Sequence, residues 1–250
     1  MDFISEIAKI CAGVEQEEGK RIREAASVCA ATIAAGRGVF LFGAGHSALP
    51  CQEAFPRIGS VVGFIQLTEP ALSYNGHVIG KGGQRQMSFW EGTSGLAEVI
   101  LANYQLQPRD TLIVISNSGI NALPVELCHL ANRQGLTTIG LTSREHSLAN
   151  QPRNPLGKRL LDLADIVIDN HTPEGDALID LGVGERLGGS STIIHMVIVN
   201  ALIVETGARL REGGFPLQVY PSHNVSGDRE GVLEKEEHVF EAYRKLMAQY

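Results

Sequence analysis

The chain has 250 residues, 44% of them hydrophobic and 20% charged, and carries a formal net charge of −7 at pH 7. This length and balance are typical of a globular α/β domain and exclude a disordered chain. The negative charge argues against a nucleic-acid backbone or an anionic membrane as the main partner. An anionic small molecule stays compatible with it, because local backbone N–H groups can outweigh a distant net charge.

The cysteines and the apolar segments predict a cytoplasmic protein without a membrane partner. The four cysteines show no CxxC spacing, and three of them lie in apolar stretches as small core residues, which fits a reducing compartment. The segment 1–20 is acidic and lacks the apolar core of a signal peptide. The longest apolar run, 193–204, is too short to span a membrane and contains His195 and Asn200.

The first third of the chain predicts helix, strand, helix and strand, followed by a loop. Apolar residues at helical spacing indicate a helix over 4–35, and the run 38–42 is wholly apolar and bounded by glycine, as in a strand buried on both faces. The remaining predictions for this part are a helix from Ala48 or Pro50 to about Arg57, a strand over 61–67 and a long loop over 68–89.

Strands and helices continue to alternate in the rest of the chain. The predicted helices are 90–104, 122–134, 190–210 and 230–250, the predicted strands are 111–115, 137–141 and 164–168, and 170–189 is predicted to be a polar loop. Such alternation predicts a parallel sheet with helices on both faces, a doubly wound three-layer α/β sandwich. We expect a single domain over 1–250, with its core at about 36–210, a helical N-terminal extension over 1–35 and a C-terminal tail and helix over 211–250.

In an open α/β sheet, ligands bind outside the carboxyl ends of the strands, so the residues that follow each strand are the candidate site. These loops are rich in glycine and hydroxyl groups. The candidates are Gly43, Gly45, His46 and Ser47 after the first strand, Ser116, Asn117, Ser118 and Gly119 after the third, Thr142 and Ser143 after the fourth, and Ser190, Ser191 and Thr192 at the start of the long helix.

Glycines, uncharged hydroxyls and helix N-termini together can hold a phosphate dianion without a lysine. The sequence has no GxxxxGK[ST] motif, and the stretch 43–48 lacks the acid about 20 residues further on that a dinucleotide fingerprint needs. We therefore expect a phosphate-bearing ligand and no cofactor. A single serine after a strand is more often only a helix cap. The prediction of a phosphate site therefore depends on the three loops taken together.

With these motifs in this order, the chain resembles the sugar isomerase (SIS) domain family over about 36–210. The resemblance is closer to a branch of stand-alone bacterial SIS proteins, to which Glu53, 57–59, 157–160, 164–170 and 224–228 also correspond. It implies a phosphosugar site and an assembly of two or more copies of the chain. The residues implied to hold the phosphate are Ser47, Ser116, Ser118, Ser191 and Thr192, and those implied to give backbone contacts are Gly45, Asn117 and Gly119.

Isomerisation of an aldose to a ketose needs a base near the carbon acid and a proton donor for the oxygens, and a carboxylate with a histidine suits this. Glu53, six residues after Ser47, is the first candidate for the base; its structural alternative is an ion pair with Arg57. In SIS enzymes the catalytic acid often lies farther along this helix, and that position here falls near Arg57. The carry-over to Glu53 therefore departs from the family pattern.

Three further residues are candidates for proton chemistry. His46 lies in the first ligand loop and His77 in the predicted loop 68–89, where a lid would place it over a substrate. Glu91 is expected in the first turn of a helix, where the helix dipole is an alternative reason for an acid. His195 lies at core spacing and is interpreted as a core histidine. The histidines and Glu53 show no HxxxH or HExxH spacing, so no metal site is expected.

The sequence thus predicts a phosphosugar-binding protein that acts as an aldose–ketose isomerase. Two alternatives stay open, namely an epimerase or lyase that acts on an amino-sugar phosphate, and a sensor that binds a sugar phosphate without chemistry. The acidic N-terminal region has no helix-turn-helix pattern, which disfavours a sensor that binds DNA.

Overall fold

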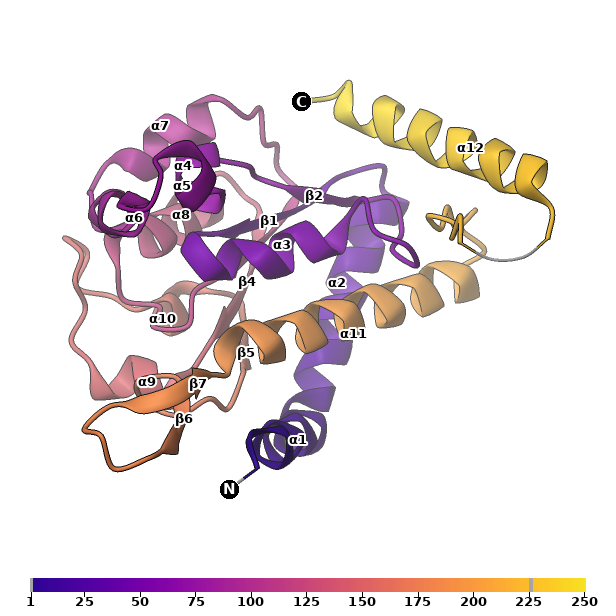
Figure 1. Ribbon diagram of the computed structural model, residues 1–250. Helices are drawn as coiled ribbons and strands as arrows, with labels where there is room; N and C mark the ends of the chain where they lie inside the picture. Colours follow the sequence, from indigo (N-terminus) through magenta and orange to yellow (C-terminus); the bar gives the residue numbers. More distant parts are fainter. Residues whose placement is uncertain (1, 225–226) are drawn as a thin grey trace.

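The computed structural model describes residues 2–224 and 227–250; Val225 and Ser226, in the stretch 224–228, lie outside the described residues. Figure 1 shows the arrangement of the elements. The helices are α1 (Phe3–Gly13), α2 (Gly19–Ala34), α3 (Ala48–Ala54), α4 (Pro70–Ser73), α5 (Asn75–Val78), α6 (Gly83–Glu91), α7 (Leu96–Ala102), α8 (Ala122–Arg133), α9 (Arg144–Ala149), α10 (Leu160–Leu163), α11 (Ser191–Glu212) and α12 (Arg229–Met247), and a π-helical turn (Val14–Glu18) joins α1 to α2.

Five parallel strands form the central sheet and confirm the predicted fold. They are β1 (Val39–Gly43), β2 (Phe64–Gln66), β3 (Thr111–Ile115), β4 (Thr137–Thr142) and β5 (Ile166–Asp169), in the order β2-β1-β3-β4-β5. In this order β2 lies on one side of β1, and β3 lies on the other side. The switch point of the sheet is therefore between β1 and β3, where doubly wound folds bind their ligands.

Helices cover both faces of the sheet, because the strands are apolar on both sides. Leu41 and Ile113 belong to the core shared with α2, α3 and α11, whereas Phe40 and Leu112 belong to the core shared with α7, α8 and α10. All four side chains are fully buried. The helix α12 contributes Tyr243 to both cores. The result is the three-layer arrangement that the apolar strands predict.

The prediction of a long loop over 68–89 is wrong, because this segment contains α4, α5 and most of α6. The first two are single turns of four residues, too short to show a 3.6-residue period. The predicted helix over 90–104 is corrected as well. Trp90 and Glu91 close α6, and α7 begins only after Gly95, whose φ of 84° no helix allows.

Further boundaries differ from the prediction, among them the strand predicted over 61–67, which covers only Phe64–Gln66. The loop 170–189 contains a two-stranded antiparallel hairpin, β6 (Ala177–Asp180) and β7 (Arg186–Gly189), whose strands are short and mostly exposed and so show no apolar alternation. Helix α3 ends at Ala54 rather than near Arg57. Pro56 follows two residues later and disfavours helical geometry at Phe55, which is extended.

Among the described residues, α11 is the helix that is long and apolar enough to span a membrane by length and composition alone. Half of its most apolar stretch is buried, and it packs against α2 and α3. This is the behaviour of a core helix.

Candidate functional site

The first and third strands deliver their loops to the same point of the sheet edge. Gly43 at the end of β1 pairs with Ile115 at the end of β3, so the residues that follow them leave the sheet at the same level. The loop after β1 forms a short 3-10 turn, Gly45–Ser47, and the loop after β3 runs from Ser116 to Asn121 into α8. The start of α11 packs against the 3-10 turn. The three predicted ligand loops therefore come together.

The loop after β1 depends on its glycines. Gly45 has a φ of 59°, and a Cβ there would lie 2.8 Å from Cε of Met87 in α6. The turn is therefore held between the sheet and α6. Within it, His46 is exposed and Ser47 is half-buried, and the Ser47 hydroxyl makes no capping bond to α3. These two side chains remain available to a ligand.

The loop after β3 is fixed by its own hydrogen bonds. The Ser116 hydroxyl accepts a hydrogen bond from the Gly119 N–H (3.2 Å), and the Asn117 carbonyl accepts one from the Thr142 hydroxyl (3.1 Å). Gly119 has a φ of 60°, and a Cβ there would lie 2.8 Å from the Thr142 oxygen. Ser118 is half-buried, and its hydroxyl has no protein partner within 2–224 and 227–250.

A buried polar network links this loop to β5 and α11. The Asn117 side-chain oxygen accepts from Nδ2 of Asn170 (2.8 Å) and from the Thr172 hydroxyl (3.0 Å). Nδ2 of Asn170 also lies 2.8 Å from Nε2 of His195 in the first turns of α11. Burial lowers the pKa of His195 from 6.5 to about 4, and the nearby Asp176 carboxylate acts in the opposite direction. His195 is therefore neutral at pH 7 and accepts the amide proton of Asn170.

The N-terminus of α11 is occupied by a carboxylate of the same chain. Oδ1 of Asp176 accepts from the backbone N–H of Ser190 (3.0 Å) and of Ser191 (2.6 Å). The Ser190 hydroxyl donates to the same oxygen (3.1 Å), and the Ser191 hydroxyl donates to Oδ2 (3.0 Å). Ser190, a candidate site residue, and Ser191, implied to hold the phosphate, are thus both engaged internally. Thr192 follows them, half-buried and without a protein partner for its hydroxyl among the described residues.

Glu91 stands beside the start of α8. It closes α6, and burial raises its pKa, while the side chain of Asn121 and the charge of Arg153 lower it. Asn121 is the residue before α8, and its side chain does not cap the helix. Glu91 therefore lies at the end of the loop that begins with Ser116, and not in the first helical turn where it was expected.

Glu53 is in a different environment. Its carboxylate forms an ion pair of 3.1 Å with Nε of Arg57, and the two side chains are 27% and 49% exposed. The structural alternative considered for Glu53 is thus present in the structure. The carboxylate thus lies at the surface of α3, in an ion pair that contributes little to stability.

The two loop histidines share one pocket. A hollow of about 420 Å³ beside the 3-10 turn is lined by His46 and His77 together with Gln52, Ser73 and other residues. Oγ of Ser73 and Nε2 of Gln52 are buried and have no hydrogen-bond partner within the described residues. Because unpaired buried polar groups are costly, these two atoms can bond to a polar group that enters the hollow, a water molecule included.

Several residues of this site were not singled out by the sequence analysis. Asn170 follows β5 directly, so the rule that ligands lie at carboxyl ends of strands would have found it. His195 was singled out as a core histidine, and it is buried, but its link to the loop after β3 through Asn170 was not foreseen. Asn121 and Asp176 carry no pattern of their own. Across the residues that the structure describes, no three His, Cys, Asp or Glu side chains gather as a metal site.

Comparison with known proteins shows which family the chain is similar to. Residues 2–143 match the SIS domain family. The chain is 32% identical over 231 residues to a UPF0309 protein of Brucella canis, covering 90% of each chain, and 32% identical over 227 residues to a UPF0309 protein of Halalkalibacterium halodurans, covering 90% of this chain and 88% of that one.

A solved structure, the phosphoheptose isomerase GmhA from Neisseria gonorrhoeae, superposes with a TM-score of 0.54 at 15% identity, over 82% of this chain and 95% of that one. A phosphoheptose isomerase from Francisella tularensis gives a TM-score of 0.53 at 17% identity, over 82% and 94%. At these identities the two structures show that the fold is shared.

Proposed function

The chain belongs to the SIS domain family, and on that basis we propose that it binds a sugar phosphate at the carboxyl edge of its sheet and interconverts its aldose and ketose forms. The observation that carries the proposal is the meeting of three hydroxyl-bearing loops at the switch point between β1 and β3. We propose that it acts in the cytoplasm, where its four free cysteines stay reduced.

We place the phosphate between the 3-10 turn and the start of α8. Within residues 2–224 and 227–250, the hydroxyls of Ser47, Ser118 and Thr192 have no hydrogen-bond partner, whereas those of Ser116, Ser190 and Ser191 already serve the fold. The N-terminus of α8 has no side-chain cap, and it offers the N–H groups of Ala122 and Leu123 and the positive end of a helix of 12 residues. The N-terminus of α11 already holds Asp176, whose charge repels a second anion.

We propose Glu91 as the base, in place of Glu53. A half-buried carboxyl with a raised pKa is suited to taking a proton from carbon, and Glu91 has this environment beside Asn121. In the proposed reaction, Glu91 removes the proton from the carbon next to the carbonyl and returns it to the neighbouring carbon of the enediol. His46 and His77, which share the pocket beside the 3-10 turn, move the proton between the two oxygens.

We also propose that two copies of the chain associate through the hairpin β6–β7 and the outer face of α11. Leu181, Val183 and Leu187 of the hairpin are 60%, 71% and 48% exposed, and Val204 of α11 is 68% exposed. A two-stranded hairpin is marginal in water by itself, and Figure 1 shows it projecting beside the start of α11. Burial of these side chains in a dimer would stabilise it.

The experiment is a thermal-shift screen of sugar phosphates, each paired with the same sugar without phosphate. A binder raises Tm by an amount that grows with the logarithm of its concentration, and the unphosphorylated sugar leaves Tm unchanged. Incubation of that binder in D2O, followed by NMR, then tests the chemistry. Deuterium at the carbon next to the carbonyl, together with the isomeric product, supports isomerisation; binding without exchange contradicts it and favours a sensor.

A further inference from the structure

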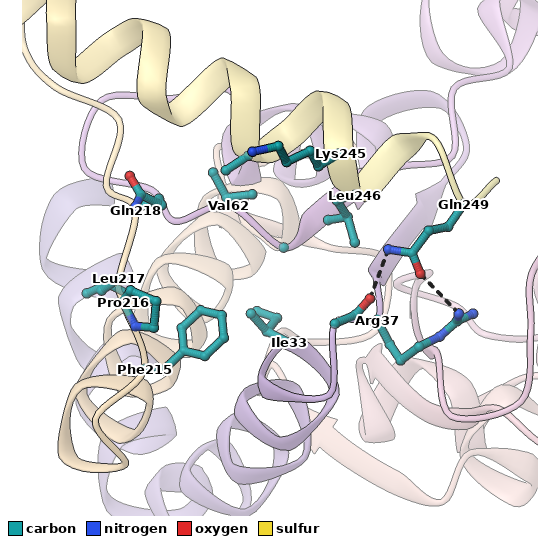
Figure 2. Close-up of a pocket in the computed structure, with 13 residues that line it drawn as sticks. Ile33, Arg37, Val62, Phe215, Pro216, Leu217, Gln218, Lys245, Leu246 and Gln249 are labelled. Carbon is teal, nitrogen blue, oxygen red and sulfur yellow. Dashed lines mark hydrogen bonds between the residues drawn. The ribbon is translucent and has the colours of Figure 1, made fainter.

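A second cavity, of about 310 Å³, lies under α12, at the end of the sheet opposite to the candidate phosphosugar site (Figure 2). Gly36 and Arg37 come just before β1, and Gly63 comes just before β2, so the cavity is at the amino ends of the strands. Its other walls are α12 and the linker 215–218 that follows α11. The candidate phosphosugar site is at the carboxyl ends and does not share residues with this cavity.

The walls of this cavity are largely apolar. Figure 2 shows the Phe215 ring facing Ile33, with Val62 and Leu246 on the side toward α12. Ile33 belongs to the buried core, so this wall is part of the folded body. An apolar space of this size is at the lower end of the range for small-molecule sites and favours an apolar body over water.

The charged residues that line the cavity, Arg37 and Lys245, are both cations, although the chain as a whole is acidic. The Arg37 guanidinium donates to both oxygens of the buried Asp110 (3.0 and 3.1 Å) and is neutralised there. Lys245 is at the rim, and its 2.7 Å ion pair with Glu241 joins two exposed side chains, which contributes little in water. Lys245 is therefore the cation that an incoming anion can use.

Hydrogen bonds at the end of α12 shape the cavity before any ligand arrives. Gln249 donates to the Gly36 carbonyl (3.1 Å) and accepts from Arg37 (3.3 Å), as the dashed lines in Figure 2 show. The Tyr250 hydroxyl donates to Asp110 (2.6 Å). Binding to a preformed cavity costs less free energy than binding to a cavity that must first open.

We propose that the cavity under α12 is a binding site for a small amphipathic anion, a monocarboxylate whose apolar chain fills the space between Ile33, Phe215 and Leu246 and whose carboxylate meets Lys245. The chemistry follows from the two parts of the site, an apolar interior and a cationic rim. Because α12 forms one wall, the bound anion holds this helix against the body of the fold. The site is independent of the sugar-phosphate chemistry proposed above.

The test is calorimetric titration of the full-length protein with octanoate, octanol and acetate. Octanoate should bind one to one, acetate should not bind, and octanol should bind more weakly because it lacks the charge. Ala242→Phe, which projects a ring from α12 into the cavity, should weaken octanoate binding by tenfold or more. Lys245→Gln should weaken it about two- to fivefold, as expected for an exposed charge pair, and leave octanol unaffected.

His238→Phe is the matched control, since it adds the same ring to an exposed position of the same helix. It should bind octanoate as the unmodified protein does. Failure of octanoate to bind the unmodified protein overturns the proposal. So does unchanged binding to Ala242→Phe, provided that its thermal unfolding shows a folded protein, and so does equal affinity for octanoate and octanol.

Discussion

Nδ2 of Asn170 lies 2.8 Å from Nε2 of His195, and this contact joins the end of β5 to the first turns of α11. The same Asn170 amide donates to the side chain of Asn117 in the loop after β3. A neutral histidine is required here, because a protonated ring would present a donor to another donor. The contact therefore makes the geometry of the candidate site depend on a buried, uncharged His195.

His195 should make the stability of the protein depend on pH. Its pKa is about 4 in the folded protein and 6.5 in the unfolded chain, so the unfolded state binds more protons between these values and stability falls as pH decreases from 6.5 toward 4. The shift corresponds to a loss of at most about 3 kcal/mol. In urea unfolding at pH 7, His195→Gln should have a lower free energy of unfolding than the unmodified protein. The difference between the two proteins should become smaller at lower pH.

The control for this prediction is His238→Gln, at an exposed position. It should follow the unmodified protein over the whole pH range. A gap between His195→Gln and the unmodified protein that stays constant from pH 7 to pH 4.5 would show that His195 does not titrate in the way inferred from its burial.

Asp176 should stabilise α11 by occupying its N-terminus. Its carboxylate receives two backbone N–H groups and two hydroxyls, so Asp176→Ala should cost about 1–2 kcal/mol in urea unfolding. Asp176→Asn keeps an acceptor and should cost less. Glu185→Ala, an exposed acid of the same hairpin, should change stability by less than about 0.5 kcal/mol. Equal effects of Asp176→Ala and Glu185→Ala would count against this role.

Kinetic measurements on variants should distinguish the role of Glu91 from that of Glu53. Glu91→Gln should keep sugar-phosphate affinity within about threefold and lose turnover by roughly 10²- to 10⁴-fold, the range for a general base. Glu53→Gln should stay near full turnover, because Glu53 is paired with Arg57 at the surface. Since the base acts when ionised and burial raises its pKa above 4.5, kcat/KM should increase with pH through a midpoint above 4.5. Loss of turnover in Glu53→Gln alone would reverse the assignment.

The proposed dimer should depend on the hairpin. Leu181→Glu combined with Leu187→Glu places like charges in the proposed interface and should convert a dimer to a monomer in light scattering. Val99→Glu, at a 62% exposed position of α7 away from the hairpin, should remain a dimer. A monomeric unmodified protein, or a double variant that stays dimeric, would contradict the interface.

The sheet and its ligand edge could be predicted from the sequence because their signals are local. The runs 38–42 and 111–115 are apolar except for Thr111 and are bounded by turn residues, so both strands were predicted to within one residue. By contrast, α4 and α5 are single turns without a period, and the hairpin has strands of only four residues, of which β6 is half-buried and β7 is exposed. Neither kind of element has a hydrophobic pattern to find.

The hydrogen bonds that some serine hydroxyls make within the protein were not predicted from the sequence. Ser116, Ser118 and Ser191 look equivalent in the sequence, since each lies at the end of a strand or at the start of a helix. Only the structure shows that Ser191 bonds to Asp176, from a distant turn, and that Ser116 bonds to Gly119. The bond of Ser191 to Asp176 joins residues far apart in the chain and that of Ser116 to Gly119 is a local turn, and the sequence does not show which serines are used in this way.

The central claim is that uncharged hydroxyls and backbone N–H groups at the start of α8 hold the phosphate of a sugar. It is tested most directly by calorimetric titration of the tightest-binding sugar phosphate into Ser118→Ala and Ser118→Asp, with Ser27→Ala, exposed on α2, as the control. Affinity should fall about tenfold or more in Ser118→Ala, since a hydrogen bond to a charged group is lost, and disappear in Ser118→Asp, while Ser27→Ala binds normally. Unchanged affinity in Ser118→Asp would contradict the account.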